Sequence, residues 1–593
     1  MAILEIIVGL LGGLCLFLYG MKAMGDGLEK VAGSRMQKII ESLTGNILKG
    51  VLIGALVTAI IQSSSATTVM VVGFVSAGIM TLKQAVGVIM GANIGTTVTA
   101  IILSINDLDG ASGVLSLFKP GFLMYVLILI GVLMIYTMKK QSGKDAGGIF
   151  FGLGILFLGM DIMSSSMKGI DMSYFEMMFA TFSKNPLLGV LVGMLVTALV
   201  QSSSASMGIL LALSSTGAVL FGGAVPIILG QNIGTCITAI LSSIGATKNA
   251  KKTALIHLLF NVIGALLFLF AIYGIKSIYP TLFPFWNLRM TNWNIAIFHL
   301  TFNVANTIVL LPFNKLLINL VNFIIKEDTE ISEEEHIYKK LDDRFLYSPS
   351  IALNQCKSAM VDMFKISKAN FELGTLAVLN GDEKAITIVQ EKEKIIDKLE
   401  VLSSHYLVKI ADRDVTELEG KTTSAFLHTV IDIERIGDYA DNLCEYATEL
   451  LSKGDSLSDS AKKELESMFT ATKEIIEITI KTFEENNKDG FRQIQPYEEV
   501  IDLFTENLKS KHIERLSLKQ CSAEVGIVFV EILNCIERIA DHCTNIAICI
   551  CQLNIKDENF DFHKYAKQLK SGEDEDYKEY FESFKQKYYN PII

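Results

Sequence analysis

Long apolar runs dominate the first 325 residues of the chain. They reach about 17 to 20 residues or more, the length that a helix needs to cross a hydrocarbon core of roughly 30 Å. These runs lie near residues 3–21, 84–105, 118–138, 147–164, 222–245, 254–278 and 294–325. The pattern predicts seven membrane-spanning helices.

Two further apolar segments, residues 47–80 and 186–220, are each interrupted at the middle by a block of hydroxyl residues. Each segment has two limbs of roughly 15 to 17 residues around a polar tip. We interpret them as hairpins that enter the membrane and return. Irregular backbone at that depth is tolerated only where protein buries it or where it lines a cavity.

The pattern changes after residue 325. A polar, acidic connection leads from about residue 350 into segments with helical periodicity, few Gly or Pro residues and many Glu and Lys residues. Such segments are typical of long amphipathic helices in bundles. We therefore predict a membrane domain (1–325), a linker (326–348), a soluble helical domain (349–555) and a polar tail (556–593).

The charges follow the same division. Residues 1–325 hold 18 Lys and Arg and 10 Asp and Glu, a net charge of +8; the remainder holds 34 and 53, a net charge of −19, so the whole chain carries −11. A mean hydropathy of +0.42 excludes a disordered chain and an ordinary soluble enzyme. The acidic second half argues against a nucleic-acid partner, since binding to a phosphate backbone needs clustered positive charge.

Three connections of the membrane domain are rich in basic residues: the one after residue 21, residues 139–144 and residues 248–252. Placing them in the cytoplasm puts the N-terminus outside and the soluble half inside. No basic region precedes the first apolar run, so we interpret that run as a retained span rather than a signal peptide. The nine cysteines lack the spacing of zinc ligands, and we expect reduced thiols.

The membrane domain contains an internal duplication. Gln-Ser-Ser-Ser-Ala at residues 62–66 recurs at 201–205, and Gly-X-Asn-Ile-Gly-Thr at 91–96 recurs at 230–235, both at an offset of 139. Each copy holds three crossings and one hairpin, so the second copy would enter the membrane from the opposite side. Such inverted repeats are the usual architecture of secondary transporters. Repeat 1 covers about residues 1–140, repeat 2 about 145–280, and residues 294–325 form an extra span.

The duplicated hydroxyl motifs carry the candidate chemistry. One Ser-rich stretch in an apolar segment is more often a helix-packing seam than a site. Two copies that each set a Gln beside three hydroxyls favour a site. Amide and hydroxyl donors, with the free N–H groups of a helix start, suit a desolvated oxyanion. The candidate anion ligands are Gln62, Ser63, Ser64, Ser65, Gln201, Ser202, Ser203 and Ser204.

Residues 42–106 and 177–325 contain no Asp or Glu, so the charge that compensates the anion must come from elsewhere. Neutral amide, hydroxyl and backbone oxygens suit a dehydrated Na⁺. The candidate sodium ligands are Thr67, Asn93, Thr96, Ser206, Asn232 and Thr235. A proton relay is less favoured, because His257 and His299 lie outside the repeated motifs and are interpreted as hydrogen-bonded packing residues.

A serine hydrolase is the enzyme alternative. The chain has no Gly-X-Ser-X-Gly elbow around these serines and no His at a repeated position that could act as the base. We therefore expect a protein that is not an enzyme.

The soluble half repeats as well. Ile-Glu-Arg-Ile-Gly-Asp at residues 433–438 recurs as Ile-Glu-Arg-Ile-Ala-Asp at 536–541, which predicts two three-helix bundles in tandem. Carboxylates four residues apart share a helix face, and two such faces together can bind a multivalent cation. The alternative is a solvated acidic face paired with Arg435 and Arg538. The candidate metal ligands are Glu393, Asp397, Glu434, Asp438, Glu498, Asp502, Glu537 and Asp541.

The two duplicated membrane motifs resemble those of the type II sodium-phosphate cotransporter family over about residues 1–320. Leu-Asp-Asp-Arg-Phe-Leu at residues 341–346, followed by Pro349, resembles the bacterial members that carry a C-terminal PhoU-like domain. The resemblance implies sodium-driven phosphate uptake, with both Gln-Ser-Ser-Ser segments forming the substrate and ion site. Thr-Thr at residues 67–68 and Ser-Met at 206–207 differ between the copies, which leaves these ligand roles open. The resemblance to PhoU implies metal clusters at the paired carboxylates; iron, zinc, magnesium or no metal are all open.

We therefore expect an all-α chain in the inner membrane of a bacterium: a polytopic domain of two inverted repeats with re-entrant hairpins, followed by a cytoplasmic PhoU-like pair of three-helix bundles. The expected function is sodium-coupled symport of inorganic phosphate, with a regulatory soluble domain. The alternatives are a membrane-tethered metal-binding regulator of phosphate signalling that transports nothing, and a transporter of another oxyanion. The sequence leaves open a homo-oligomer and a cytoplasmic signalling partner.

Overall fold

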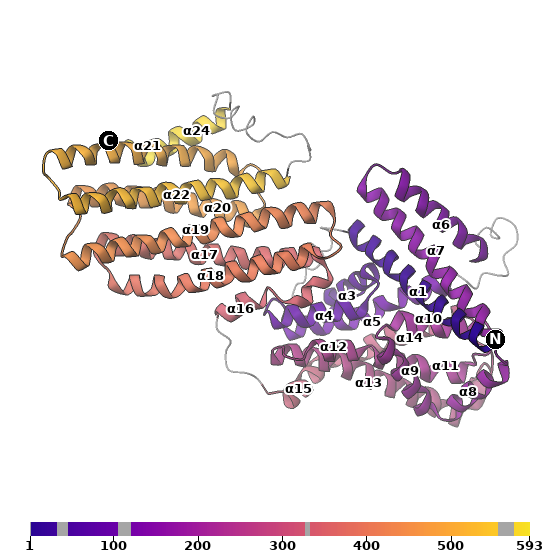
Figure 1. The fold of residues 1–593 in the computed structure, drawn as a ribbon. Coiled ribbons are helices and arrows are strands. Elements are labelled where there is room, and N and C mark those ends of the chain that lie inside the picture. Colours follow the sequence, from indigo (N-terminus) through magenta and orange to yellow (C-terminus); the bar gives the residue numbers. More distant parts are fainter. Residues whose placement is uncertain (1, 33–45, 105–119, 327–332, 555–573, 593) are drawn as a thin grey trace. The chain divides into compact units, whose positions relative to one another are not determined.

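The computed structural model describes residues 2–32, 46–104, 120–326, 333–554 and 574–592. The chain forms two compact units, Met1–Ile331 and Ser332–Ile593. The secondary structure of the described residues is almost entirely helical, apart from one isolated β-bridge between Leu220 and Arg289 (Figure 1). The prediction of an all-α chain is confirmed.

The first unit consists of apolar helices that occur in two comparable series. The first series is α1 (Ala2–Ala32), α3 (Ile47–Ile61), α4 (Ser64–Ser76), α5 (Leu82–Ser104) and α6 (Pro120–Thr137). The second is α7 (Gln141–Met167), α8 (Met172–Lys184), α9 (Pro186–Val200), α10 (Ser203–Ser214), α11 (Phe221–Gly234), α12 (Cys236–Ser242) and α13 (Lys248–Ile278). After the 3₁₀ turn η3 (Pro280–Leu282) follow α14 (Asn292–Leu310), η4 (Leu311–Phe313) and α15 (Asn314–Ile324).

Six described helical segments are long and apolar enough to cross a membrane, and the bent pair α8 and α9 raises this number to seven if it counts as one span. Six of the seven predicted spans coincide with these segments. The seventh, residues 118–138, corresponds to α6, whose described apolar part is shorter, and residues 118 and 119 lie outside the described residues. The six are Leu4–Val31, Leu82–Ser104, Gln141–Met167, Phe221–Ser242, Lys248–Ile278 and Asn292–Ile324.

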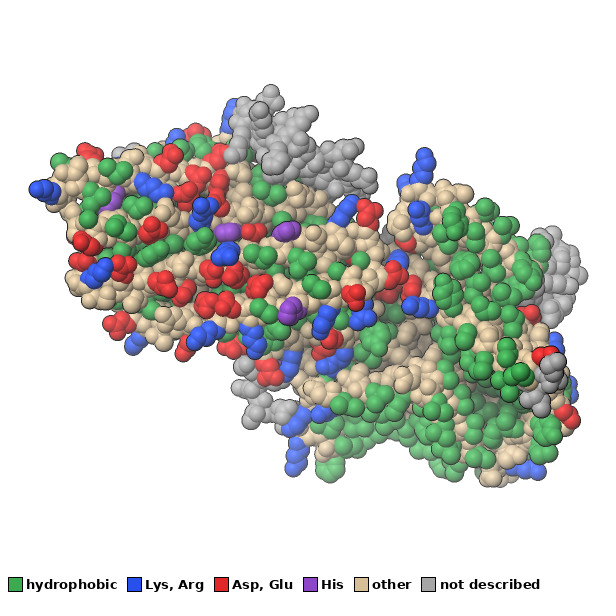
Figure 2. All heavy atoms as spheres, in the orientation of Figure 1, with side chains coloured by type: hydrophobic (Ala, Val, Ile, Leu, Met, Phe, Trp, Pro, Cys, Tyr) green, Lys and Arg blue, Asp and Glu red, His purple; other side chains and the backbone are tan. Residues whose placement is uncertain are grey.

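The surface of the first unit is apolar over wide areas, as Figure 2 shows. Large hydrophobic side chains on several helices stand free of the protein, among them Leu52, Leu199, Phe270 and Phe323. A soluble protein rarely exposes such contiguous apolar surface. The first unit is therefore a multi-pass membrane domain whose outer face suits lipid.

Both predicted hairpins are pairs of short helices, α3 with α4 and α9 with α10. In each copy glycines let the first limb approach the following helix closely. A Cβ on Gly54 would lie 2.1 Å from the Val88 carbonyl oxygen, and a Cβ on Gly193 would lie 2.2 Å from that of Ile227. These two glycines are 139 residues apart, so the duplication extends to the backbone contacts of α3 with α5 and of α9 with α11.

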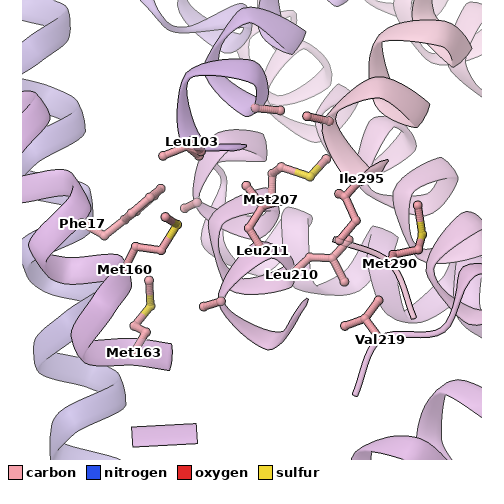
Figure 3. Packing of buried hydrophobic residues seen from close by; sticks show 14 of the residues in the cluster. Phe17, Leu103, Met160, Met163, Met207, Leu210, Leu211, Val219, Met290 and Ile295 are labelled. Carbon is pink, nitrogen blue, oxygen red and sulfur yellow. The ribbon is translucent and has the colours of Figure 1, made fainter. Parts of the chain in front are cut away.

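The interior of the first unit is rich in methionine. Phe17 of α1, Met160 and Met163 of α7, and Met207 and Leu211 of α10 pack together (Figure 3). Methionine side chains are flexible and fill irregular spaces well. The second limb of the second hairpin therefore lies in an adaptable core.

The second unit consists of long helices that lie side by side (Figure 1). They are α17 (Pro349–Asn380), α18 (Glu383–Ala411) and α19 (Glu417–Lys453), then α20 (Asp459–Glu485), α21 (Gly490–Ser517) and α22 (Ala523–Asn554). Residues with strong capping preferences mark the helix ends. Helix α17 begins at Pro349 and ends at Gly381, and α19 begins with a capping box of Thr416 and Glu419 and ends at Gly454. Gly381 and Gly454 both adopt the left-handed conformation.

Short helices flank the six long ones. The region predicted as a linker contains α16 (Glu333–Lys339) and η5 (Asp343–Tyr347). In the region predicted as a polar tail, residues 574–592 form α24 (Glu575–Phe584) and η7 (Lys585–Tyr589), in which Tyr577, Phe584 and Tyr588 are buried. Phe584 stacks on Tyr497 of α21, with ring centroids 3.8 Å apart. The described part of the tail is therefore a packed element of the second unit.

Candidate functional site

The two hairpin tips have the same local structure. Gln62 ends α3 with a φ of 58°, and Gln201 ends α9 with a φ of 54°. Both values lie in the left-handed region, which residues other than Gly rarely adopt. The next residue is extended and caps the second limb: Ser63 Oγ accepts the Ala66 N–H at 3.1 Å, and Ser202 Oγ accepts the Ala205 N–H at 3.2 Å. Rare backbone conformations of this kind concentrate at functional sites.

Each tip places the start of a helix inside an apolar domain. The first N–H groups of α4 and α10 have no partner within their own helix, and the helix dipole adds partial positive charge there. Ser64 and Ser65 follow the cap in one copy, and Ser203 and Ser204 in the other. Such an arrangement can bind an anion through hydroxyl and backbone donors without a fixed cation.

The two glutamines differ, although their backbones agree. Gln62 is buried; its Oε1 accepts a hydrogen bond from Thr99 Oγ1 of α5 at 2.9 Å, and its Nε2 donates to the Ala59 carbonyl. Gln201 is exposed, and within the described residues its side chain has no hydrogen-bond partner. Gln62 is therefore held by the protein, whereas Gln201 is free to contact a ligand.

The predicted sodium ligands of the hairpins bond to the first limbs. Thr67 Oγ1 lies 3.0 Å from Thr58 Oγ1, and Ser206 Oγ lies 2.8 Å from Thr197 Oγ1. Ser206 Oγ also accepts a hydrogen bond from Gln231 Nε2 at 2.9 Å. Two accepted hydrogen bonds occupy both lone pairs of the Ser206 hydroxyl, so this oxygen could bind Na⁺ only after a local rearrangement.

The predicted sodium ligands on the Asn-Ile-Gly-Thr motifs bond mainly within their own helices. Asn93 and Asn232 each donate Nδ2 to the carbonyl four residues earlier at 2.9 Å. The hydroxyl of Thr96 donates to the Ala92 carbonyl, and that of Thr235 to the Asn232 carbonyl. Hydroxyl lone pairs of Thr96 and Thr235 thus stay available to a cation.

The second limb of each hairpin crosses to the other copy. Ala205 and Leu211 of α10 share a buried cluster with Ala100 and Leu103 of α5. Val72 of α4 packs in the same way with Ala239 of α12 and with α13. The two copies are therefore interleaved. Among the residues that the structure describes, no hydrogen bond joins Gln62–Ser65 directly to residues 201–204.

Sequence reasoning missed several residues that hold the hairpins in place. Thr58 and Thr197 are a pair at the same offset of 139, so the repeat could have revealed them. The repeat also marks Thr99 through its counterpart Thr238, but it does not show that only Thr99 bonds a glutamine. Gln231 could not be found in this way, because it replaces Ala92. The counterpart of Thr99, Thr238, donates to the Thr235 carbonyl instead.

In the second unit, only part of the predicted metal set comes together. One carboxylate oxygen each of Glu393, Asp397 and Asp438 lies within 4.8 Å of the other two, between α18 and α19. Burial, then the neighbouring carboxylate of Asp397, raises the pKa of Glu393 to about 7. Burial and the charge of Asp438 likewise raise the pKa of Glu434 to about 7. Crowded, partly buried carboxylates of this kind suit a multivalent cation.

The corresponding carboxylates on α21 and α22 have other partners. Glu498 accepts a hydrogen bond from Gln495 Nε2 at 2.6 Å, and Glu537 pairs with Lys509 at 3.1 Å. Asp541 pairs with Arg538 at 3.4 Å, and Asp438 of the first group pairs with Arg435 at the same distance. Within the described residues Glu498, Asp502, Glu537 and Asp541 do not form a second group of convergent ligands.

The nine cysteines are all free thiols.

Comparison with known proteins gives the class of the fold. The Na⁺/Pi-cotransporter family matches residues 16–165 and 159–285, and the PhoU domain matches residues 360–447 and 465–550. The chain belongs to the Na⁺/Pi-cotransporter family and carries C-terminal PhoU domains. The resemblance inferred from the motifs is confirmed, and a transporter family agrees with the expectation of a protein that is not an enzyme.

Three relatives illustrate the range of similarity. YjbB of Escherichia coli K12, provisionally named an inorganic phosphate export protein, is 24% identical over 563 residues, 93% of this chain and 98% of YjbB. The uncharacterized protein YqeW of Bacillus subtilis is 33% identical over 52% of this chain and 95% of its own length. Human sodium-dependent phosphate transport protein 2B is 30% identical over 23% of each chain.

A solved structure also resembles part of the chain. The crystal structure of PhoU from Pseudomonas aeruginosa covers 34% of this chain and 96% of that chain, at 20% identity and a TM-score of 0.33.

Proposed function

We propose that the chain carries inorganic phosphate across a bacterial cell membrane in a cycle coupled to Na⁺. The observation that supports this function most is the pair of left-handed Gln turns followed by serine caps, in a domain without carboxylates over residues 177–325. Phosphate would bind the helix starts and hydroxyls of residues 62–65 and 201–204. Na⁺ would supply the compensating charge through neutral oxygens near Asn93, Thr96, Asn232 and Thr235.

The transport cycle would rest on the duplication. In this proposal the two copies are inverted, the N-terminus lies outside, and the second unit lies in the cytoplasm. The interleaving of α10 with α5 and of α4 with α12 supports a shared site, because movement of one copy would change the surroundings of the other hairpin tip. Alternating access in transporters works through such rocking of repeats around a fixed site.

The direction of transport has two candidates. A sodium-coupled symporter with an inward Na⁺ gradient takes phosphate up. Export is favoured by a specific observation: YjbB, which matches this chain over almost its whole length, is provisionally named an export protein. The same binding residues would serve both directions, since a coupled carrier is reversible.

Proteoliposomes that contain the full-length chain test this proposal. We expect phosphate flux to follow a Na⁺ gradient imposed in either direction, and to stop when choline replaces Na⁺. Flux that is equal with choline would exclude coupling to Na⁺ and leave an uncoupled exporter. No flux under any gradient would favour the membrane-tethered regulator.

We further propose that the second unit binds a multivalent cation at Glu393, Asp397 and Asp438, with Glu434 close by, and regulates transport. The convergence of three carboxylates supports this proposal. Glu498, Asp502, Glu537 and Asp541 do not converge within the described residues, which makes the other predicted set the weaker candidate. Pairing with arginine does not distinguish the sets, since Asp438 and Asp541 each pair with the Arg three residues earlier at 3.4 Å.

A further inference from the structure

Helices α13 and α14 carry the same short motif. His-Leu-Leu-Phe-Asn-Val occupies residues 257–262, and His-Leu-Thr-Phe-Asn-Val occupies residues 299–304, 42 residues later. This repeat is separate from the duplication at an offset of 139. His257 and His299 lie outside the motifs repeated at the offset of 139, but they do belong to a repeated motif, contrary to the expectation from the sequence.

The His and Asn residues of both motifs are buried in a domain that has no carboxylate in this region. His257, Asn261, His299 and Asn303 are each at most 3% exposed. In both motifs the Asn Nδ2 donates to the carbonyl of the His four residues earlier, at 3.0 Å in α13 and 2.9 Å in α14. These bonds fix the orientation of each amide, because in the flipped orientation Oδ1 would lie against the carbonyl oxygen and the two acceptors would repel each other.

A third asparagine joins the two helices. Asn306, one turn after Asn303, donates Nδ2 to the Phe260 carbonyl of α13 at 3.3 Å. Its amide atoms lie 2.2 to 2.4 Å from the place that a Cβ on Gly264 would take, so only glycine allows this approach. The motif faces of α13 and α14 therefore meet through Asn306.

The same residues border the interruption between α11 and α12. His299 Nε2 lies 3.4 Å from Asn232 Oδ1, and Asn261 Nδ2 lies 3.4 Å from Cys236 Sγ. We name His257, Asn261, His299, Asn303 and Asn306 the histidine–asparagine cluster. It adjoins the second Asn-Ile-Gly-Thr motif but consists of side chains that neither hairpin contains.

The unpaired amide atoms of the cluster are acceptors. The Oδ1 atoms of Asn261, Asn303 and Asn306 are buried and have no hydrogen-bond partner among the described residues, whereas all three Nδ2 atoms donate. Unpaired buried acceptors are costly, so such groups are normally occupied. The Nδ1 atoms of His257 and His299 are also buried without a hydrogen-bond partner among the described residues, and an imidazole N–H there would bond the lone pairs of a water molecule, so water is the occupant that competes with a cation. A cation is bound by acceptor atoms alone. Because this site has no carboxylate to balance a second charge, a monovalent cation fits it best.

We propose that the histidine–asparagine cluster binds a dehydrated Na⁺ through the amide oxygens of Asn261, Asn303 and Asn306. This site is additional to the hairpin ligands of the proposed function. Its occupancy does not require phosphate or transport, so it can be tested apart from them.

The test is thermal unfolding of the purified full-length chain, without phosphate, as choline chloride is replaced by NaCl at constant ionic strength. We expect Na⁺ to raise the unfolding midpoint of the wild type. Asn303→Leu should raise the Na⁺ concentration for half the effect at least about tenfold. Asn303→Asp keeps an oxygen at this position and adds charge, so it should lower that concentration. Asn314→Leu is the matched control, because Asn314 also bonds a backbone carbonyl but lies in α15; it should leave the Na⁺ dependence unchanged.

Thr96→Val removes a sodium ligand of the proposed function, and its combination with Asn303→Leu separates the two sites: Asn303→Leu should weaken the Na⁺ effect in the Thr96→Val background as well. No stabilisation of the wild type by Na⁺ would overturn the proposal, and so would an equal Na⁺ dependence in Asn303→Leu and the wild type. If Asn303→Leu does not fold, Asn306→Ser and Asn303→Asp decide: an unchanged Na⁺ dependence in both contradicts the site. Sodium-driven flux that fails while this Na⁺ effect persists would refute the proposed function alone.

Discussion

Single residues differ in role between two copies that share a backbone. The left-handed Gln62 and Gln201 make the same turn, but only Gln62 is bonded by a neighbouring helix, through Thr99. The motif spacing predicted that both glutamines mark hairpin tips. The spacing could not predict that only Gln62 is bonded, because Thr99 and Thr238 occupy equivalent positions in the sequence. The structures differ at this point: α11 is interrupted at Thr235, whereas α5 continues past the equivalent position, and Thr238 bonds the Thr235 carbonyl. The contact depends on tertiary geometry.

Replacing the two glutamines should therefore give two different defects. Gln201→Ala removes a donor to the anion and should raise the KM for phosphate about tenfold, as for the loss of one hydrogen bond to a charged group, while the unfolding midpoint stays unchanged. Gln62→Ala leaves Thr99 without its partner and should lower the unfolding free energy by about 1 kcal/mol or more. Flux kinetics and thermal unfolding of both variants measure the two effects. Equal defects in both assays would contradict the assignment.

The duplication includes the contacts between pairs of helices as well as the sequence motifs. The alternation of apolar limbs around hydroxyl blocks predicted two hairpins, and a helix ends at each block and another begins, α3 before α4 and α9 before α10. The apolar pattern does not indicate how close the limbs lie to α5 and α11. That closeness appears in the glycines, whose missing Cβ atoms make room for backbone carbonyls at about the same place in each copy.

The close approach predicts a pair of contrasting glycine variants. Gly193→Ala would force a Cβ against the Ile227 carbonyl oxygen of α11, so it should destabilise the first unit by about 2 kcal/mol or more. Gly274→Ala in α13 is the control, because nothing lies within 4 Å of its Cβ position and alanine favours the helix by about 1 kcal/mol. Thermal unfolding checks both. Similar stability of the two variants would mean that α9 and α11 are not in close contact.

The carboxylates between α18 and α19 predict a dependence on pH. The folded-state pKa values of Glu393 and Glu434 lie near 7, above the ordinary 4.5, so the folded chain holds more protons in this window. Without metal, their contribution to stability is present at low pH and is lost as the pH rises through about 7. Mn²⁺ binding needs the ionised forms and should strengthen between about pH 6 and pH 8.

Calorimetric titration of the full chain with Mn²⁺ at both pH values checks this expectation. Glu434→Gln should weaken the pH dependence. Glu417→Gln is the control, since Glu417 is exposed and its pKa is lowered by Lys421. Binding of equal strength at both pH values would argue against these carboxylates as ligands.

At the scale of the whole molecule, the chain has two compact units with different surfaces. The first exposes apolar side chains and the second exposes charges (Figure 2). The change in charge near residue 326 predicted two such regions from composition alone. Composition could not predict α24, because Tyr577 and Phe584 lie in a charged stretch and are buried only by packing onto the rest of the second unit. The polar composition of this stretch therefore did not indicate that it contains the ordered helix α24.

In the proposed function the hairpin tips bind phosphate and Na⁺ as one coupled site. The most direct measurement is the phosphate Kd of the full-length protein, in NaCl and in choline chloride, for the wild type and for Ser203→Ala. We predict that Na⁺ tightens phosphate binding by the wild type at least about tenfold, a coupling of roughly 1.4 kcal/mol, and that Ser203→Ala weakens binding in NaCl. A Kd that is the same in both salts, or that Ser203→Ala leaves unchanged, would refute a coupled site at the hairpin tips.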